Sequence, residues 1–153
     1  MIEGMYTALI SPFRNGRLDL ESYENLIKDQ IKKGIDGFIV NGTTGESPTL
    51  ETEEVFLLLE KTKSVAKGKK IILGCGSNST YKTIELANTL ESKGGIDAFL
   101  VVVPYYNKPT QEGLFQHFKT IHDSTSVPII LYNVPGRTVI SMQPETCARL
   151  SQL

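Results

Sequence analysis

The chain has 153 residues, of which 40% are hydrophobic and 22% charged, a composition typical of a globular domain with a sizeable core. Its formal net charge of −1 gives no electrostatic argument for binding to nucleic acid or to an anionic membrane. The N-terminal residues show no basic segment followed by an apolar one, and no apolar run approaches the length of a membrane span. We therefore expect a soluble, cytoplasmic, single domain over residues 1–153, without a linker.

The cysteines and histidines show no metal-binding pattern. Cys75 and Cys147 form no Cys-x-x-Cys motif and have no metal-type spacing to His117 or His122. Free, buried thiols are the interpretation that fits a cytosolic protein. We expect no metal and no other cofactor.

Short apolar runs recur about every 30 residues, which is the length of a βα unit. As continuous apolar runs, they are typical of parallel strands covered on both faces. The predicted strands are residues 7–10, 37–40, 71–73, 98–103 and 128–132. Amphipathic segments between them predict helices over residues 18–33, 51–66, 80–93 and 111–123, and a last helix starting near residue 143. The first helix has Asp19 as its expected N-cap, with a staple between Leu18 and Tyr23.

Five consecutive βα units predict an α/β protein with a parallel sheet. Two architectures fit this pattern. One is an open, doubly wound sheet, and the other is the first part of a (β/α)8 TIM barrel, which needs about 250 residues. The chain ends within the fifth helical pattern without a C-cap glycine, which favours the partial barrel.

The segment after the second predicted strand organises the chain. It has the sequence Val40-Asn41-Gly42-Thr43-Thr44-Gly45-Glu46-Ser47-Pro48 and precedes an acidic helix. Glycines let the backbone turn sharply and approach a ligand closely. Threonine hydroxyls and backbone N–H groups near a helix N-terminus would suit a carboxylate. Ordinary turn and capping chemistry explains the same residues equally well.

Further polar clusters follow the fourth and fifth predicted strands. They are Pro104-Tyr105-Tyr106-Asn107-Lys108-Pro109 and Tyr132-Asn133-Val134-Pro135-Gly136-Arg137-Thr138. Ligands of parallel α/β folds bind at the carboxyl ends of the strands. There Tyr132 could take part in a chain of hydroxyls with Thr43 and a second tyrosine, and Arg137 presents a planar fork to a carboxylate or phosphate. A single strand-end tyrosine is more often a packing residue, but three clusters at one end of a sheet favour a site.

These three clusters resemble motifs of the dihydrodipicolinate synthase family, which belongs to the pyruvate-dependent class I aldolases. The resemblance runs from Met5 to Leu153, with further matches at residues 9–13 and 111–118. It implies a (β/α)8 barrel, of which this chain would hold the first five βα units. It also implies lysine biosynthesis through diaminopimelate, by condensation of pyruvate with aspartate semialdehyde through a Schiff base.

The resemblance further implies a role for each site residue. Tyr132 resembles the family's proton-relay tyrosine, and Thr43 would link it to Tyr106, which reaches across a tight dimer interface. Thr44 would hold the pyruvate carboxylate through its backbone N–H and hydroxyl. Arg137 would orient the carboxylate of the semialdehyde. The family's homotetramer of tight dimers is the expected assembly.

Other functions remain as alternatives. The chain could belong to another pyruvate aldolase such as an N-acetylneuraminate lyase, but those enzymes resemble this pattern without the arginine at position 137. It could also be a non-catalytic half-barrel that serves as an interaction module. The apolar run Ile129-Ile130-Leu131 in the last strand shows no polar adaptation of an exposed edge, which argues against a module.

The chain departs from the family pattern in two respects. The Schiff-base lysine follows the sixth strand in the family, and this chain has no sixth strand, so we expect it to be inactive and prone to self-association by itself. No other lysine qualifies, since those at positions such as 108, 82 and 119 lie in a loop or on helices. The second departure is Lys82, which stands where feedback-sensitive members have a glutamate. It predicts weak inhibition by lysine.

Overall fold

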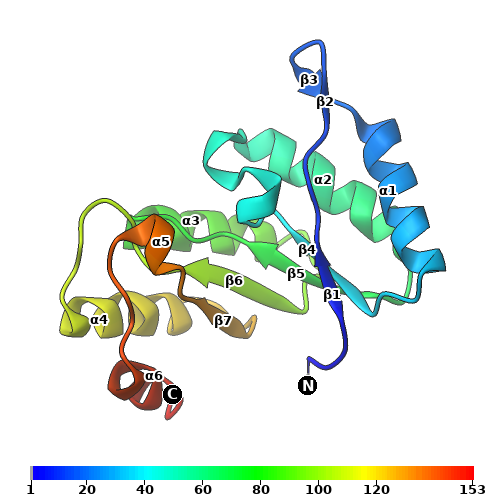
Figure 1. The fold of residues 1–153 in the computed structure, drawn as a ribbon. Helices are drawn as coiled ribbons and strands as arrows, with labels where there is room; N and C mark the ends of the chain where they lie inside the picture. Colours follow the sequence, from blue (N-terminus) through cyan, green and yellow to red (C-terminus); the bar gives the residue numbers. More distant parts are fainter. Residues whose placement is uncertain (1) are drawn as a thin grey trace. The chain divides into compact units, whose positions relative to one another are not determined.

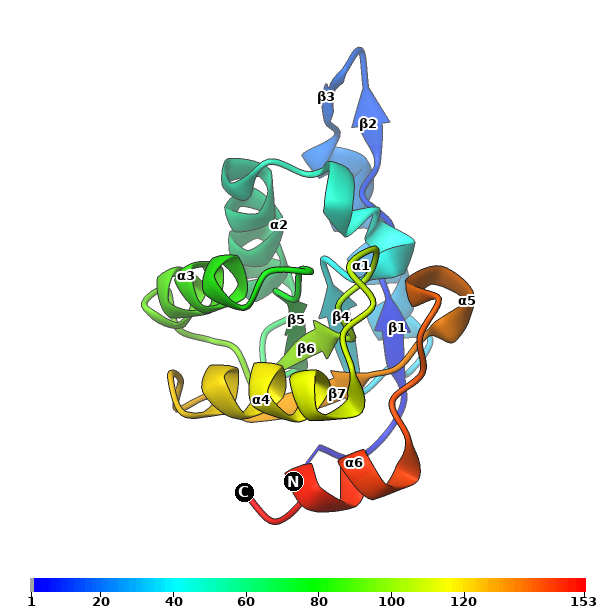
Figure 2. The ribbon, with the colours of Figure 1, turned by 90° about the vertical axis from the view of Figure 1, so that its left-hand side faces the viewer.

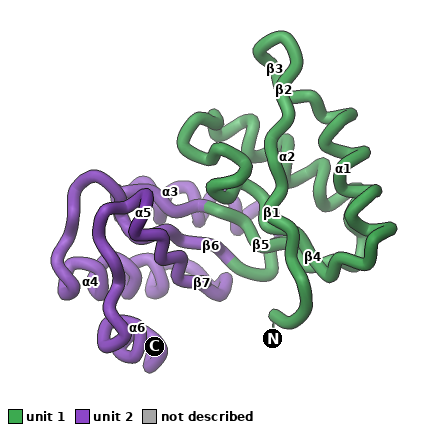
Figure 3. The backbone as a smooth tube through the Cα atoms, in the orientation of Figure 1, with its two compact units in different colours: residues 1–74, 95–98 green, residues 75–94, 99–153 purple. Residues whose placement is uncertain are grey.

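The protein has an α/β fold in the computed structural model, which describes residues 2–153. Five strands form one sheet in the order β1-β4-β5-β6-β7, and a two-stranded hairpin is separate from it (Figure 1). The chain divides into two compact units. The first runs to Gly74 and includes Gly95–Ala98, and the second consists of Cys75–Gly94 and Phe99–Leu153 (Figure 3).

Parallel strands form the centre of the first unit. β4 (Gly37–Val40) pairs with β1 (Tyr6–Ala8) on one side and with β5 (Lys70–Gly74) on the other. The side chains of Phe38, Val40 and Leu73 are completely buried, which agrees with the continuous apolar runs in the sequence. A hairpin of β2 (Phe13–Arg14) and β3 (Arg17–Leu18) projects away from the helices of this unit (Figures 1 and 2).

Two helices of the first unit pack against each other. α1 (Leu20–Lys32) is capped by Asp19, whose Oδ1 accepts from the Ser22 N–H at 3.0 Å, and α2 (Thr52–Val65) begins with a capping box of Glu51 and Glu54. The Tyr23 hydroxyl of α1 lies 3.0 Å from Thr62 Oγ1 of α2 in the core. The helices are therefore joined by a buried polar contact as well as by apolar packing.

Charged side chains join the same helices at the surface. Glu24 of α1 accepts from Lys28 on its own helix, at 2.6 Å, and from Lys61 of α2, at 2.7 Å. Hydrogen bonds from these two ammonium groups, Lys28 first, lower the pKa of Glu24 to about 2.

The second unit contains two strands and four helices. β6 (Ala98–Val102) pairs in parallel with β7 (Ile129–Tyr132), and Val102 lies opposite Tyr132. The helices are α3 (Thr80–Glu91), α4 (Gln111–His122), α5 (Pro135–Thr138) and α6 (Pro144–Leu150). α6 lies beside α4 in both ribbon views (Figures 1 and 2).

Side chains hold the helices of the second unit in place. Glu91 at the end of α3 accepts hydrogen bonds from the Thr125 hydroxyl and from the Ser126 N–H and hydroxyl, in the loop before β7. Arg149 of α6 donates to Glu112 of α4 at 2.8 Å, and its guanidinium carbon lies 4.0 Å from the centre of the Phe115 ring. The cation–π contact supplements an exposed ion pair that is weak by itself.

The prediction of five βα units is confirmed, with small differences at element ends. The predicted first helix begins too early, because Leu18 belongs to β3 and the helix starts after the Asp19 cap. The last helix does not continue to the final residue, because it ends at Leu150 and is followed by Ser151 as C-cap. The β2–β3 hairpin and α5 were not predicted. The hairpin turns at Asn15-Gly16, both at positive φ, a turn signal that the sequence carries.

The prediction that both cysteines are free and buried is partly confirmed. Both cysteines are free, but only Cys75 is buried, whereas Cys147 is half-buried on α6. Among the helices of residues 2–153, none combines the length and hydropathy that a bilayer crossing requires.

His117 of α4 is a buried group whose charge affects stability. Only 6% of its surface is exposed, and its Nδ1 lies 2.9 Å from Thr80 Oγ1 of α3. Its Nε2 is buried and has no hydrogen-bond partner within the described residues. Burial lowers the pKa of His117 from 6.5 to about 4, because a charged imidazolium would be desolvated there.

We predict that acid weakens the second unit through His117. The unfolded state binds the proton more readily, so the contribution is complete above pH 6.5 and decreases as the pH falls toward 4. The loss is at most about 1.4 kcal/mol per pH unit. Urea denaturation at several pH values measures it. His117→Gln should flatten the pH dependence, whereas His122→Gln on the exposed side of the same helix should not. Equal slopes for the wild type and His117→Gln would contradict the assignment.

Candidate active site

The turn after β4 starts at Asn41, which has left-handed backbone geometry with φ of 54°. Asparagine is among the few non-glycine residues that adopt this conformation readily. Its Nδ2 donates to the Gly74 carbonyl at the end of β5, at 2.8 Å. A Cβ at position 74 would lie 2.0 Å from the Asn41 carbonyl oxygen. Position 74 therefore requires glycine, and the Asn41 side chain joins the two strand ends.

The threonines lie in the 3₁₀ turn η1 (Thr43–Gly45), which follows at once. Gly45 is buried, and its carbonyl accepts from the Ser11 hydroxyl at 2.8 Å. A Cβ at Gly45 would lie 3.0 Å from the Leu9 carbonyl oxygen, so this turn is pressed against the segment after β1. Thr43 is half-buried and Thr44 is exposed. The turn thus presents Thr44 to solvent from a rigid backbone.

The threonines lie near the N-terminus of α2, as predicted, but a second turn stands between them and that helix. Glu46 has left-handed geometry with φ of 60°, and a second 3₁₀ turn, η2 (Ser47–Thr49), separates η1 from α2. α2 begins only at Thr52. Pro48 lies inside η2 and constrains this connection. A carboxylate at Thr44 would therefore meet the N–H groups of a 3₁₀ turn and not the dipole of α2.

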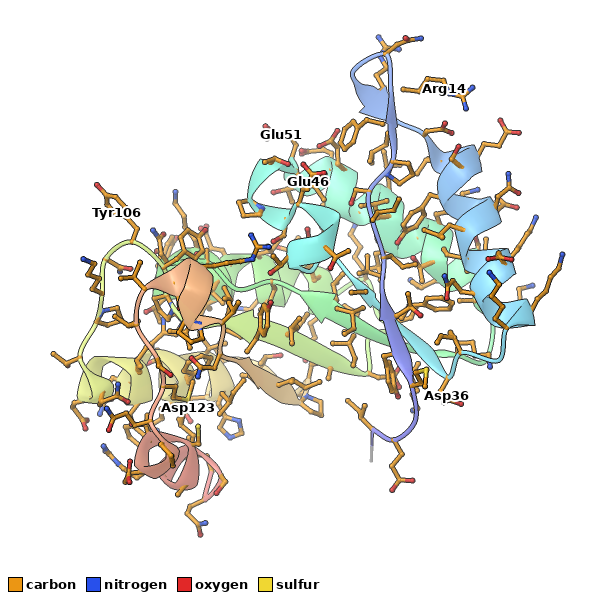
Figure 4. The ribbon with its side chains drawn as sticks, viewed as in Figure 1. Arg14, Asp36, Glu46, Glu51, Tyr106 and Asp123 are labelled. Carbon is orange, nitrogen blue, oxygen red and sulfur yellow. The ribbon has the colours of Figure 1, made fainter. Side chains whose placement is uncertain are left out.

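In the second unit, the loop after β6 leaves the sheet beside Tyr132. The Val103 N–H donates to the Tyr132 carbonyl at 2.9 Å. Tyr106 has φ of 74°, is 87% exposed, and points away from the ribbon (Figure 4). Asn107 Nδ2 donates to the Asn78 carbonyl at 3.0 Å and ties the loop to the segment before α3.

Tyr132 is the last residue of β7 and is half-buried. The chain then forms α5, a single helical turn that carries Arg137 with an exposed side chain. Thr138, next to it, is buried, with its hydroxyl within hydrogen-bonding distance of the Val134 and Ile140 carbonyl oxygens. Arg137 is therefore displayed on the outside of a turn whose inner side is anchored.

Within each unit, the structure brings some of the predicted residues together. Thr43 and Thr44 share one turn of the first unit. In the second unit, Tyr132 and Arg137 lie on consecutive segments, and the loop of Tyr106 starts at the strand paired with Tyr132. These positions agree with the clusters predicted at strand ends.

Several supporting residues were not predicted to have a role. Ser11, Asn41 and Asn133 all lie within the segments noted in the sequence, and each makes a hydrogen bond that fixes a turn. Only Asn41 carried a local signal, since an Asn-Gly pair after a strand favours positive φ. The partners of Ser11 and Asn133 depend on the tertiary fold.

Two other kinds of site lack support in the described residues. Residues 2–153 contain no cluster of three or more histidine, cysteine or acidic side chains that could hold a metal ion. Burial raises the pKa of the Cys75 thiol to about 12, so a thiolate nucleophile at this position is strongly disfavoured.

We predict that Asn41 stabilises the first turn in two separable ways. Asn41→Gly removes the bond to the Gly74 carbonyl and should reduce the free energy of unfolding by about 1–2 kcal/mol. Asn41→Ala removes the same bond but keeps a Cβ at positive φ without the polar side chain that lets asparagine adopt this conformation, so it should cost about 1 kcal/mol more than Asn41→Gly. Urea denaturation compares the two variants.

Asn88, exposed on α3, is the matched control. There glycine should cost about 1 kcal/mol more than alanine, because the position is helical. If Asn41→Ala were as stable as Asn41→Gly, the left-handed geometry at position 41 would not contribute.

Comparison with known proteins adds to this geometry. The model of a family described as "Dihydrodipicolinate synthetase family" matches residues 1–153. A curated 4-hydroxy-tetrahydrodipicolinate synthase from Thermotoga maritima is 51% identical over 152 residues, which are 99% of this chain and 51% of that protein. The chain thus spans about half the length of the curated relatives it matches.

Solved structures give the same result. The chloride-inhibited dihydrodipicolinate synthase from Acinetobacter baumannii, complexed with pyruvate, has a TM-score of 0.96 at 42% identity, covering all of this chain and 53% of that one. The enzyme from Cyanidioschyzon merolae with lysine bound has a TM-score of 0.91 at 40% identity, covering 98% of this chain and 52% of that one. The fold is therefore that of one half of these TIM-barrel enzymes, as the sequence predicted.

Proposed function

Because this chain belongs to the dihydrodipicolinate synthetase family, we propose that it is the N-terminal half of a 4-hydroxy-tetrahydrodipicolinate synthase. That enzyme, a lyase, would condense pyruvate with aspartate semialdehyde through a Schiff base, in lysine biosynthesis via diaminopimelate. The observation that carries the proposal is the match over the whole chain, with 51% identity to a relative of that activity. The strand-end turns support it, because they present hydroxyl groups and a guanidinium.

Each predicted residue has a chemical role in the proposed reaction. Tyr132 would relay protons near the imine, together with the hydroxyls of Thr43 and Tyr106. Thr44, exposed on its 3₁₀ turn, would bind the pyruvate carboxylate through its N–H and hydroxyl. Arg137 would bind the carboxylate of the semialdehyde in a bidentate manner. A carboxylate anchor on each substrate holds the reacting carbons in a near-attack pose.

We infer that the nucleophile comes from outside these 153 residues. A Schiff-base lysine needs a desolvated amine with a lowered pKa, but every lysine in the described chain is exposed or half-buried. Lys108 is exposed in the loop after β6, and Lys119 is paired with Asp123 on α4. We therefore propose that the chain alone is inactive.

Pyruvate and sodium borohydride test this directly. In a Schiff base, the lysine amine adds to the pyruvate ketone with loss of water, and borohydride reduces the imine to a stable secondary amine. We expect no adduct on the 16.9 kDa chain. We expect one adduct on a hybrid in which residues 1–153 are followed by the unmatched C-terminal part of the Thermotoga maritima relative. Intact mass measures both.

This experiment tests the missing nucleophile and the proposed function separately. An adduct on the short chain would contradict the missing nucleophile, and a hybrid without adduct or synthase turnover would contradict the proposed function. Tyr132→Phe in the hybrid should still form the adduct while kcat falls about 10²- to 10⁴-fold, as expected for loss of a proton-transfer group. Turnover of N-acetylneuraminate in place of aspartate semialdehyde would indicate the lyase.

The assembly and location follow from the same proposal. We expect a cytoplasmic homotetramer of tight dimers. A neighbouring subunit would supply contacts for the Tyr106 side chain, which is 87% exposed and has little to contact within one chain. Its loop is held in place by the Asn107 side chain, so the ring is presented in a defined direction for a neighbouring subunit.

We also propose weak feedback by lysine. Lys82 is exposed on the first turn of α3, whose N-cap is Ser79. A cation here would repel the ammonium groups of lysine. In the hybrid, Lys82→Glu should lower the lysine concentration that gives half-inhibition. Lys93 is exposed beyond the end of α3, and Lys93→Glu is the charge-matched control, which should leave this concentration unchanged. Strong inhibition of the unmodified hybrid below millimolar lysine would overturn this proposal.

A further inference from the structure

The segment that follows Arg137 is irregular and strained. Val139 has left-handed geometry with φ of 70°, although it is β-branched and 67% exposed. Such a residue adopts this conformation only where its surroundings impose it. Residues 139–143 contain no helix or strand before α6 begins at Pro144. Something other than regular structure must hold this segment.

Gln111, on the first turn of α4, supplies three of the required contacts. Its Nε2 donates to the Ser141 carbonyl at 2.9 Å. Its Oε1 accepts from the Gln143 N–H at 3.1 Å and from the Thr146 hydroxyl at 2.7 Å. One half-buried amide therefore binds the segment and the start of α6 together.

Asn133, which precedes α5 in the chain, binds the same segment. It follows Tyr132 at the end of β7, and its Oδ1 accepts from the Met142 N–H at 3.1 Å. Its Nδ2 donates to the Ser141 hydroxyl at 3.0 Å. Met142 itself is buried. Asn133 and Gln111 thus close a loop that contains all of α5.

The side chain of Arg137 has no such support. Within residues 2–153 its guanidinium makes no hydrogen bond or ion pair. α5 has only four residues, too few for a stable helix by itself. The place of the guanidinium is therefore set by the backbone of α5, and this backbone is held through the segment that Gln111 and Asn133 bind.

We propose that Gln111 and Asn133 are positioning residues for Arg137. By fixing residues 141–143 they maintain the left-handed turn at Val139 and keep the guanidinium in place for a substrate carboxylate. A pre-positioned arginine loses less entropy when substrate binds. Removing the two amides should therefore weaken the affinity for that substrate. This inference rests on the proposed function only for the identity of the carboxylate.

Amide hydrogen exchange on the 153-residue chain tests the contacts without any assay of activity. In Gln111→Leu, the Gln143 amide should lose at least about tenfold protection, as expected for loss of one hydrogen bond. In Gln111→Glu it should remain protected, because the acceptor oxygen is retained. The Val103 amide, bonded to the Tyr132 carbonyl, is the internal reference.

The matched control is Gln116→Leu. Gln116 is exposed on the same helix and donates only to Glu112, so its loss should leave the Gln143 amide unchanged. If Gln143 exchanged at the rate of an unstructured peptide in the unmodified chain, or kept its protection in Gln111→Leu, the proposal would be overturned.

Kinetics of the hybrid distinguish positioning from stability. Gln111→Leu should raise the KM for aspartate semialdehyde about tenfold or more while the KM for pyruvate stays the same. Gln111→Glu keeps the acceptor oxygen but loses the donor to the Ser141 carbonyl, so it should raise this KM less. Arg137→Ala is measured in parallel. If Arg137→Ala leaves the KM for the semialdehyde unchanged, the proposed role of Arg137 fails. If Arg137→Ala raises it and Gln111→Leu does not, the positioning role fails.

Discussion

Parallel strand pairing is the constraint on which the candidate site depends. Parallel strands in register end at the same edge of a sheet, so the loops that follow them are brought together without any contact between the loops themselves. In the second unit, the hydrogen bond from the Val103 N–H to the Tyr132 carbonyl continues this pairing to the last residue of β7. The Tyr106 loop and the α5 turn therefore leave the sheet side by side.

Strained backbone is concentrated at these strand ends. Among residues 2–153, the non-glycine residues with positive φ are Asn15, Asn41, Glu46, Tyr106, Lys108 and Val139. All but Asn15 lie in the connections that follow β4, β6 and β7. Such conformations cost energy and persist where surrounding contacts impose them. These residues lie in the loops that carry Thr44, Tyr106 and Arg137. We infer that the strained turns serve to place these three side chains.

Polar side chains supply the contacts that maintain these turns. In the first unit, Ser11 and Asn41 bind main-chain carbonyls at 2.8 Å. In the second, Gln111 and Asn133 bind three successive residues of the segment before α6. The residues proposed to meet substrate remain exposed or half-buried, and the amides and hydroxyls of these supporting residues hold the turns that carry them. Such an arrangement, in which one set of residues holds the turns and another meets the substrate, is expected where a site must be pre-organised.

The sequence by itself determined the fold class, because apolar runs and amphipathic segments report directly which faces of each element are buried. It also determined which residues stand at strand ends, and its motifs determined the family. Only the tertiary structure decided how those residues are held. The 3₁₀ turn at Thr43 is bound by the Ser11 hydroxyl, 34 positions from Gly45. Gln111 binds the segment after Arg137 and the start of α6, and its contact with the Thr146 hydroxyl spans 35 positions. No local pattern encodes such pairs, because a hydrogen bond between distant residues exists only after the strands and helices between them have packed.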